Sequence, residues 1–158
     1  MQTWARPIMC YLAVALTVVV CWGTSSGAAA PPPGIVNYGQ MDLSGTVICP
    51  ANPPGGTQWT DLLLSVALTT AGGPAWLSVT LNVVTVQTAN PMTFQAVVDG
   101  VPRESITTHL FNAGVLVFER LYPLAAGGHT FSGRVSCGQE NSLTSGWLSV
   151  YELPLMKK

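Results

Sequence analysis

The sequence contains little charge of either sign. Only 8% of its 158 residues are Asp, Glu, Lys or Arg, and the 6 basic residues nearly balance the 7 acidic ones. Without a basic patch or a run of like charges, the chain lacks the usual means of binding nucleic acid or an anionic membrane surface. Lys and Glu are also too scarce to cover the exposed side of long helices, which excludes a coiled coil. We therefore expect no nucleic-acid partner and no membrane partner beyond the hydrophobic N-terminus.

Catalytic and metal-binding signatures are missing as well. After residue 30 the chain contains no G-x-S-x-G or H-E-x-x-H motif. The seven acidic residues are scattered, with neither EF-hand spacing nor an aspartate cluster for calcium. After residue 30, two thiols and two histidines remain, and their spacing matches no zinc site. We predict a protein without enzymatic activity, cofactor or metal, and a small hydrolase with an unrecognised site is the alternative.

The first thirty residues have the layout of a secretory signal peptide. Arg6 is their only charged residue, residues 8–22 form an apolar run, and residues 25–30 are small and neutral. The 15-residue apolar run is shorter than the roughly 20 residues that cross a bilayer. We therefore predict cleavage within residues 28–30 and secretion. If the segment is retained, the protein is anchored at the cell surface.

The chain after the leader contains two cysteines, Cys49 and Cys137. Its 128 residues suit one domain, and its 5 basic and 7 acidic residues give a net charge of −2. An even number of cysteines without a CxxC motif indicates one disulfide in an oxidising compartment. A bridge over a loop of this length stabilises a fold by about 4 to 5 kcal/mol on chain-entropy grounds. Both cysteines also lie at the ends of expected strands, at positions that face the core.

Hydrophobic and polar residues alternate in short segments after a proline-rich lead-in at residues 31–40. This period of two is typical of half-buried strands, and turns rich in glycine and proline separate the segments. No segment has the period of a helix. We predict an all-β domain over residues 41–155, an antiparallel two-sheet sandwich and most simply a jelly roll. The eight expected strands are residues 41–49, 62–69, 76–86, 92–98, 105–111, 115–122, 129–137 and 147–153.

Local signals refine this prediction. Asp99 and Gly100 separate two strand segments, and both residue types accept the positive φ angles of a type I′ hairpin turn. In residues 76–86 the hydrophobic positions change parity between Val83 and Val84, which predicts a β-bulge there. Residues 138–146 are polar and are expected to form a loop before the last strand.

The histidines and acidic residues have structural explanations. His109 lies opposite a hydrophobic row and is expected to face solvent. His129 opens a strand, where its ring is expected to bond to a neighbouring turn, and a role as general base is the alternative. Asp99 is explained by its turn. The remaining glutamates considered are expected to be solvated: Glu104, Glu119, Glu140 and Glu152.

Aromatic side chains are the candidate binding residues. On the last strand Trp147 and Tyr151 alternate with Leu148 and Val150, so they point outward if the aliphatic residues form the core. Exposed rings stack on sugars or anchor protein interfaces. The alternative is that a loop or residues 35–38 cover these rings. The candidates are Trp59, Trp76, Trp147 and Tyr151.

Residues 94–153 resemble the C-terminal half of jelly-roll modules secreted by bacteria and phages. The likeness rests on three motifs, QAVVDGVP, LYPLAAGGHTFSGRV and WLSVYEL. Carbohydrate-binding modules, lectin-like sandwiches and sandwiches of the tumour-necrosis-factor and C1q type share such hairpin, strand-entry and closing-strand motifs. The resemblance implies a jelly roll and a non-catalytic role in recognition or assembly. It transfers no binding residue, because such modules place their ligand sites in variable loops.

The low charge indicates how such a module acts. The outward rows of the expected strands contain Thr, Ser, Val and Ala, whereas the surface of a monomer is usually richer in charge. We predict a secreted structural or adhesive subunit that forms a homo-oligomer or binds an extracellular partner. A glycan-binding module that uses exposed aromatic residues is the alternative.

Overall fold

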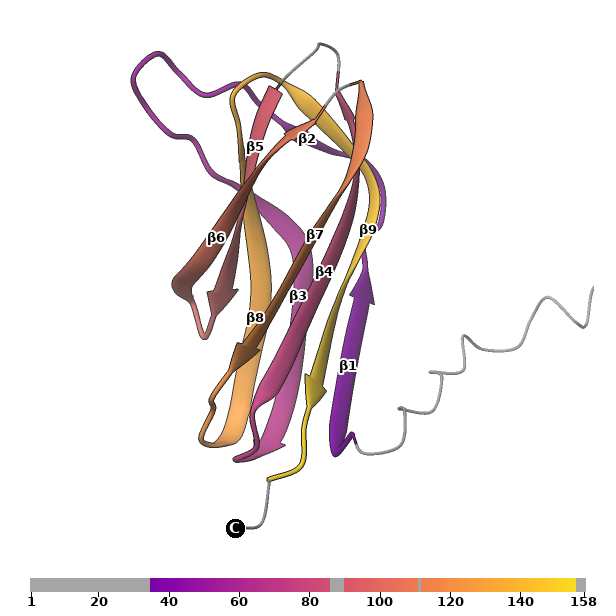
Figure 1. The fold of residues 1–158 in the computed structure, drawn as a ribbon, viewed down its shortest axis with the longest axis vertical. Coiled ribbons are helices and arrows are strands. Elements are labelled where there is room, and N and C mark those ends of the chain that lie inside the picture. The colour runs from indigo at the N-terminus through magenta and orange to yellow at the C-terminus, as the bar shows by residue number, and fades with distance from the viewer. Residues whose placement is uncertain (1–34, 86–89, 111, 156–158) are drawn as a thin grey trace, which may run out of the picture. The chain divides into compact units, whose positions relative to one another are not determined.

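The computed structural model describes residues 35–85, 90–110 and 112–155 (Figure 1). Predictions for the leader, for residues 31–34 and for the strand ends at residues 86 and 111 lie outside these ranges. The described residues form strands and no helix, and hence no helix long and apolar enough to span a membrane. The strands are β1 (Asn37–Asp42), β2 (Val47–Cys49), β3 (Thr60–Ala71), β4 (Ala75–Thr85), β5 (Asn90–Val98), β6 (Val101–Leu110), β7 (Ala113–Tyr122), β8 (Ala126–Cys137) and β9 (Asn141–Glu152).

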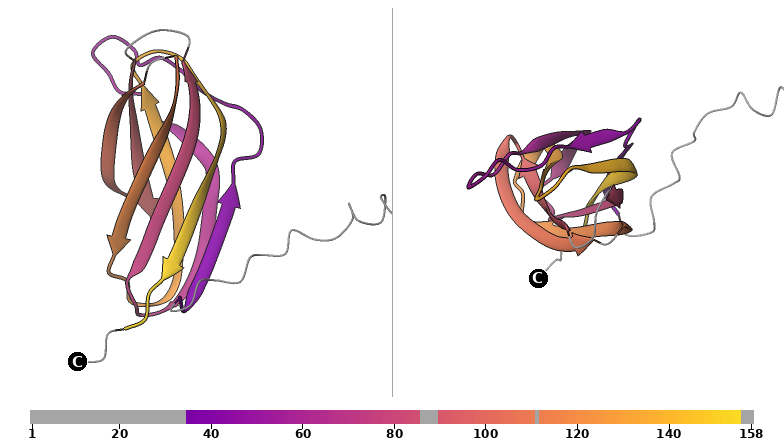
Figure 2. Two further views of the ribbon diagram at one scale, coloured as in Figure 1. Left: turned by 45° about the vertical axis from the view of Figure 1, so that its right-hand side comes forward. Right: turned by 90° about the horizontal axis from the view of Figure 1, so that it is seen from above.

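These strands form two antiparallel sheets that pack face to face (Figure 2). Sheet A has the order β1-β9-β4-β7, and β2 pairs with the other half of β9. Sheet B has the order β3-β8-β5-β6. From β2 onward, the chain changes sheet at every connection except the β5–β6 hairpin. This topology is a jelly roll, which confirms the predicted fold class.

The edge of sheet A formed by β1 and β2 differs from the prediction. The sequence predicts one strand over residues 41–49, but two strands lie there, so the described chain has nine strands. The strands are separated at Gly45, whose φ of 85° interrupts the extended backbone. β1 begins at Asn37, inside the expected lead-in. Because β9 begins at Asn141 within the expected loop, it is long enough to pair with both strands.

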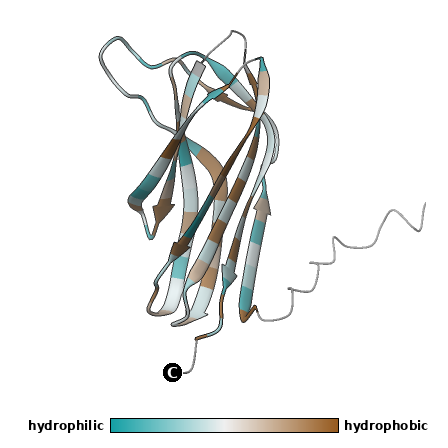
Figure 3. Cartoon of the chain, viewed as in Figure 1, coloured by the Kyte–Doolittle hydropathy of each residue, from teal (hydrophilic) through white to brown (hydrophobic). Residues whose placement is uncertain are grey.

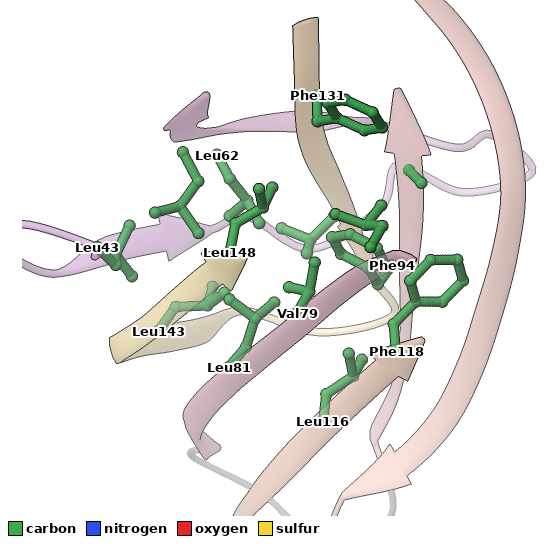
Figure 4. Packing of buried hydrophobic residues seen from close by; sticks show 14 of the residues in the cluster. Leu43, Leu62, Val79, Leu81, Phe94, Leu116, Phe118, Phe131, Leu143 and Leu148 are labelled. Atoms are coloured by element: carbon green, nitrogen blue, oxygen red, sulfur yellow. The ribbon is translucent and has the colours of Figure 1, made fainter. Parts of the chain in front are cut away.

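The core lies between the sheets and follows the alternation of the strands. In β3 every second side chain from Leu62 to Thr70 is buried, and the side chains between them are exposed. Phe94 of sheet B and Phe118 of sheet A meet inside the sandwich, with their ring centroids 5.0 Å apart (Figure 4). Gly133 makes room for this contact, because a Cβ atom there would overlap the ring of Phe94. Burying each such large side chain contributes about 1.5 to 3 kcal/mol to stability.

The predicted hairpin turn is present, whereas the predicted bulge lies on another strand. Asp99 and the glycine after it have φ angles of 53° and 74°, as a type I′ turn requires. The register of β4 and β9 shifts between Asn82 and Val83, but the extra residue, Thr144, belongs to β9. Val84 is exposed, so the alternation of β4 continues through it. Its hydrophobic side chain lies on the surface and does not mark a change of parity.

Cys49 and Cys137 form the predicted disulfide. Both residues are buried, and their Cα atoms are 6.1 Å apart. Because Cys49 ends β2 and Cys137 ends β8, the bridge joins sheet A to sheet B. The β2–β3 loop is held at the same place, since the amide of Asn52 donates a 2.8 Å hydrogen bond to the carbonyl of Cys137.

Glu152 corrects the expectation that the glutamates are solvated. Its exposed fraction is 0%, and it lies on the inward side of β9, two residues after the buried Val150. Its carboxylate accepts hydrogen bonds from the side-chain amide of Asn37 and from the backbone amides of Ala71 and Gly73, the latter two at 2.6 and 3.1 Å. Burial alone would raise the pKa of this carboxyl, but the hydrogen bonds outweigh burial and hold it below its usual value. The carboxylate therefore ties β1 to the turn between β3 and β4.

Candidate functional site

Three of the four predicted aromatic residues lie on the outward side of sheet A. Paired residues on adjacent strands point to the same side of a sheet. The register places Tyr151 between Tyr38 and Trp76, and Leu121 follows Trp76 in the same row. Trp147 lies on the same side of β9, four residues before Tyr151. We refer to the outward side chains of β1, β2, β4, β7 and β9 as the sheet A outer face.

Exposed hydrophobic side chains are concentrated on this face. In the described part of the chain twelve large hydrophobic side chains are exposed, and the strand register places half of them on the sheet A outer face. β7 contributes three of them and is hydrophobic along most of its length (Figure 3). The six are Ile48, Val84, Val115, Val117, Leu121 and Trp147. Such a concentration on one face is typical of an interaction surface.

Charge is nearly absent from the sheet A outer face. Its outward positions in the described strands include two carboxylates, Asp42 and Glu119, and neither Lys nor Arg. Asp42 accepts a 3.0 Å hydrogen bond from the side-chain amide of Gln40, and Glu119 accepts one of 3.4 Å from the hydroxyl of Ser78. Removing water from this face is therefore less costly than from a charged surface.

A hollow of about 370 Å³ lies at one end of the sheet A outer face. Beside it Tyr38 packs on Tyr151, with ring centroids 5.1 Å apart. The alternative that residues 35–38 cover the aromatic residues therefore holds at this end only. Trp147 is 41% exposed. Four hydrophobic side chains line the hollow: Ile35, Trp76, Tyr151 and Leu153.

Trp59 is separate from the other three aromatic residues and lies against sheet B. Its half-buried ring faces the guanidinium of Arg134, whose Cζ is 4.7 Å from the ring centroid. Arg134 alternates with buried residues of β8, so it points outward from sheet B. Its Nε and Nη2 both donate hydrogen bonds to Oε1 of Gln95, at 2.9 and 2.7 Å. The four predicted binding residues are thus divided between two faces of the sandwich.

Both ring nitrogens of His129 are engaged. Nδ1 lies 2.8 Å from Oδ2 of Asp99, and Nε2 lies 3.0 Å from the carbonyl of Ala125. Because both partners accept hydrogen bonds, this geometry suits a protonated ring. The hydrogen bond to Asp99 raises the pKa of His129, and hydrogen bonds from His129 and the Thr130 amide lower the pKa of Asp99. As predicted, His129 bonds to neighbouring turns, and neither of its nitrogens is available as a general base. His109 is exposed, as expected.

The hydrophobic residues of β7 were not among the predicted binding residues. Exposed Val115 and Val117 alternate with buried Leu116 and Phe118, so β7 is hydrophobic on both sides. A strand with one side in water usually carries polar residues there. The uninterrupted hydrophobic run in β7 could therefore have indicated from the sequence that this strand has a hydrophobic outer side.

The described residues contain no group of three or more His, Cys, Asp or Glu side chains that could hold a metal ion. The candidate site is therefore built from hydrophobic and aromatic surface on sheet A, together with the Trp59 and Arg134 pair on sheet B.

Sequence comparison does not identify a protein family for this chain. No protein-family model matches it, and no curated protein matches it.

Solved structures share its fold. A chain of the infectious bursal disease virus Gx strain matches with a TM-score of 0.55 and 11% identity, over 85% of this chain and 38% of that chain. The VP2 subviral particle of infectious bursal disease virus matches with a TM-score of 0.51 and 12% identity, over 83% of this chain and 37% of that chain. The CBM36-1 domain of a multidomain xylanase from the hindgut metagenome of Trinervitermes trinervoides matches with a TM-score of 0.43 and 12% identity, over 75% of this chain and all of that chain. The chain thus spans little more than a third of the viral chains, and at this identity the likeness shows the fold alone.

Proposed function

We propose that this protein is a non-catalytic structural subunit that self-associates through the sheet A outer face. The observation that carries the proposal is the placement of six of the twelve exposed large hydrophobic side chains on this face. Removing hydrophobic surface from water contributes about 25 cal/mol per Å². With two hydrogen-bonded carboxylates and no Lys or Arg at the outward positions of its described strands, this face has little charge to oppose burial.

A second copy of the chain is the partner that fits this face best. In a two-fold contact the same patch lies on both sides, so hydrophobic rows meet hydrophobic rows and no opposite charge is needed. A different protein is usually selected and oriented by complementary charge, which this face does not provide. The hollow supports the same partner, because its lining of Ile35, Trp76, Tyr151 and Leu153 suits a hydrophobic side chain better than a sugar hydroxyl.

The fold and the disulfide are consistent with a role outside the cytoplasm. A chain of similar fold, VP2, is found in a subviral particle, so this jelly roll is compatible with assembly. We propose that the chain is exported, since its first thirty residues have the layout of a signal peptide and the bridge between Cys49 and Cys137 needs an oxidising compartment.

The experiment that tests self-association places a charge on each face in turn. Val117 is 50% exposed on the sheet A outer face, and Thr69 is exposed on the outward side of β3 in sheet B. Val117→Lys would place an ammonium group in the proposed contact, where removing it from water is costly, so we expect it to weaken association at least about 10-fold. Thr69→Lys is the matched control and should leave association unchanged. Light scattering on the oxidised chain, residues 31–158, measures both.

Equal oligomer sizes for the Val117→Lys variant, the Thr69→Lys variant and the unmodified protein would exclude the sheet A outer face as the contact. Circular dichroism of each variant checks that the sandwich is intact. Because both positions are exposed and lie within strands, neither substitution should change stability by more than about 0.5 kcal/mol.

Glycan recognition is the second candidate function, and a separate observation favours it. The half-buried ring of Trp59 lies outside the hydrophobic hollow, against a sheet whose outward positions are rich in hydroxyl groups. An aromatic ring beside hydrogen-bonding side chains is a suitable surface for a sugar. If this function is correct, Trp59→Leu will weaken binding of a saccharide about 3- to 10-fold, whereas Leu155→Ala, at an exposed position beyond the end of β9, will leave it unchanged.

A further inference from the structure

We propose that the outer face of sheet B binds a carboxylated saccharide through Arg134 and Trp59. The proposal rests on glycan recognition, the second candidate function, and adds a site and a chemical class of ligand. It concerns the face opposite to the one proposed for self-association, so each can fail without the other.

Arg134 is a cation without a carboxylate partner. Among the described residues the one ion pair within 4.0 Å joins His129 to Asp99. Of the five N–H donors of a guanidinium, Arg134 uses two, and both are directed at the same oxygen of Gln95. The other donors have no acceptor in the described part of the chain. Arginine presents its donors as a planar fork that matches the two oxygens of a carboxylate.

The neighbours of Arg134 hold it in place before any ligand arrives. Trp59 lies against the guanidinium, and Gln95 accepts its two hydrogen bonds. Gln95 is itself fixed, because its side-chain amide donates a 2.9 Å hydrogen bond to the carbonyl of Arg103. The loop that carries Trp59 is anchored by Asn52, whose Oδ1 accepts hydrogen bonds from the amide of Gln58 and the hydroxyl of Ser136. A side chain ordered in this way loses little entropy on binding.

The surroundings favour a saccharide over an acidic peptide. β8 lies between β3 and β5 and pairs with both, so its backbone is not available to add a peptide strand. A ligand must therefore bind through side chains. Trp59 provides a ring that can stack on a sugar, and Ser132 of β8 and the bonded pair Thr93 and Thr107 provide hydroxyl groups on the same face.

Asp61 is the acidic residue nearest to Arg134 in the strand register. Its Cα is paired with that of Arg134, yet its carboxylate lies more than 4.0 Å from the guanidinium. Its negative charge would repel an anionic ligand. Asp61→Asn should therefore strengthen binding, and this opposite effect separates electrostatic recognition of the ligand from a general loss of structure.

Isothermal titration of the oxidised chain, residues 31–158, with tetragalacturonate tests the proposal. The matched ligands are an uncharged galactose tetramer and tetraglutamate. We expect Arg134→Met to weaken binding of tetragalacturonate roughly 10- to 100-fold, the range for hydrogen bonds to a charged group. Trp59→Leu should weaken it about 3- to 10-fold, as loss of a ring contact does. Leu155→Ala, at an exposed position beyond the end of β9, should have no effect.

Arg134→Lys is a second variant that retains the charge, and it should also weaken binding, because a lysine has no planar fork. Equal affinity for the uncharged tetramer would overturn the proposal and leave glycan recognition standing. Equal affinity for tetraglutamate would show a bare anion site and would overturn it too. Absence of binding by any saccharide would overturn both this proposal and glycan recognition.

Discussion

A substitution at Glu152 tests whether its buried carboxylate stabilises the fold through three hydrogen bonds. Glu152→Gln keeps the shape of the side chain and removes its charge. Oε1 can still accept hydrogen bonds from the amides of Ala71 and Gly73, but these bonds lose the strength that the negative charge gives them. At the other end, the new amide group would face the side-chain amide of Asn37, a donor opposite a donor.

The expected loss follows from these three hydrogen bonds. A hydrogen bond to a charged group contributes about 1.5 to 3 kcal/mol and a neutral one about 1 kcal/mol. Weakening two bonds and losing the third should lower the free energy of unfolding by about 3 to 4 kcal/mol. For a domain of this size that corresponds to a fall in Tm of about 10 °C. Urea unfolding of the disulfide-intact protein at pH 7 measures the loss, and Glu119→Gln is the control, since Glu119 is exposed and has one long hydrogen bond.

The loss should also depend on pH. The pKa of Glu152 is lower in the folded than in the unfolded chain, so its contribution is complete above the unfolded pKa of about 4.3. It disappears as the pH falls through the lower, folded value. The difference between the unmodified protein and Glu152→Gln should therefore shrink on acidification. A difference below about 1 kcal/mol at pH 7, or one that does not change with pH, would refute the reasoning.

Two further predictions concern the disulfide and His129. Replacing both Cys49 and Cys137 with alanine removes a bridge with a sequence separation of 88 residues and should cost about 4 to 5 kcal/mol in urea unfolding; a loss under about 1 kcal/mol would contradict that role. For His129, whose pKa is raised, the stabilisation is complete below the unfolded pKa of about 6.5 and is lost as the pH rises through the folded value. Because Asp99 is 43% exposed, we expect His129→Gln to cost only about 0.5 to 1 kcal/mol at pH 6 and less at pH 9, and a cost that is equal at both values would argue against a charged ring.

The fold class could be predicted from sequence because alternation and turn residues are local properties. The period of two in β3 and the turn at Asp99 needed no knowledge of distant residues. The disulfide was predictable because only two cysteines follow residue 30. The strand at Asn37 was missed because a proline-rich stretch precedes it, and it becomes a strand by pairing with the far end of the chain.

The candidate site was less predictable because it depends on which strands are neighbours. The outward direction of Trp147 could be read from β9 alone, but its place in one face with Val117 depends on the pairing of β9 and β7 with β4. Glu152 shares the inward parity of Val150, and only its charge suggested solvent. The amides that bind its carboxylate come from a turn about eighty residues earlier. Likewise, no local feature of the sequence predicted the contact between Trp59 and Arg134.

Light scattering of the unmodified, oxidised chain over a range of concentrations tests the central claim most directly. If the sheet A outer face binds a second copy, the mass measured at high concentration should be at least twice the mass of residues 31–158. On dilution the mass should fall toward that of a single chain. A single-chain mass at every concentration would contradict self-association and would leave the sheet A outer face without its proposed partner.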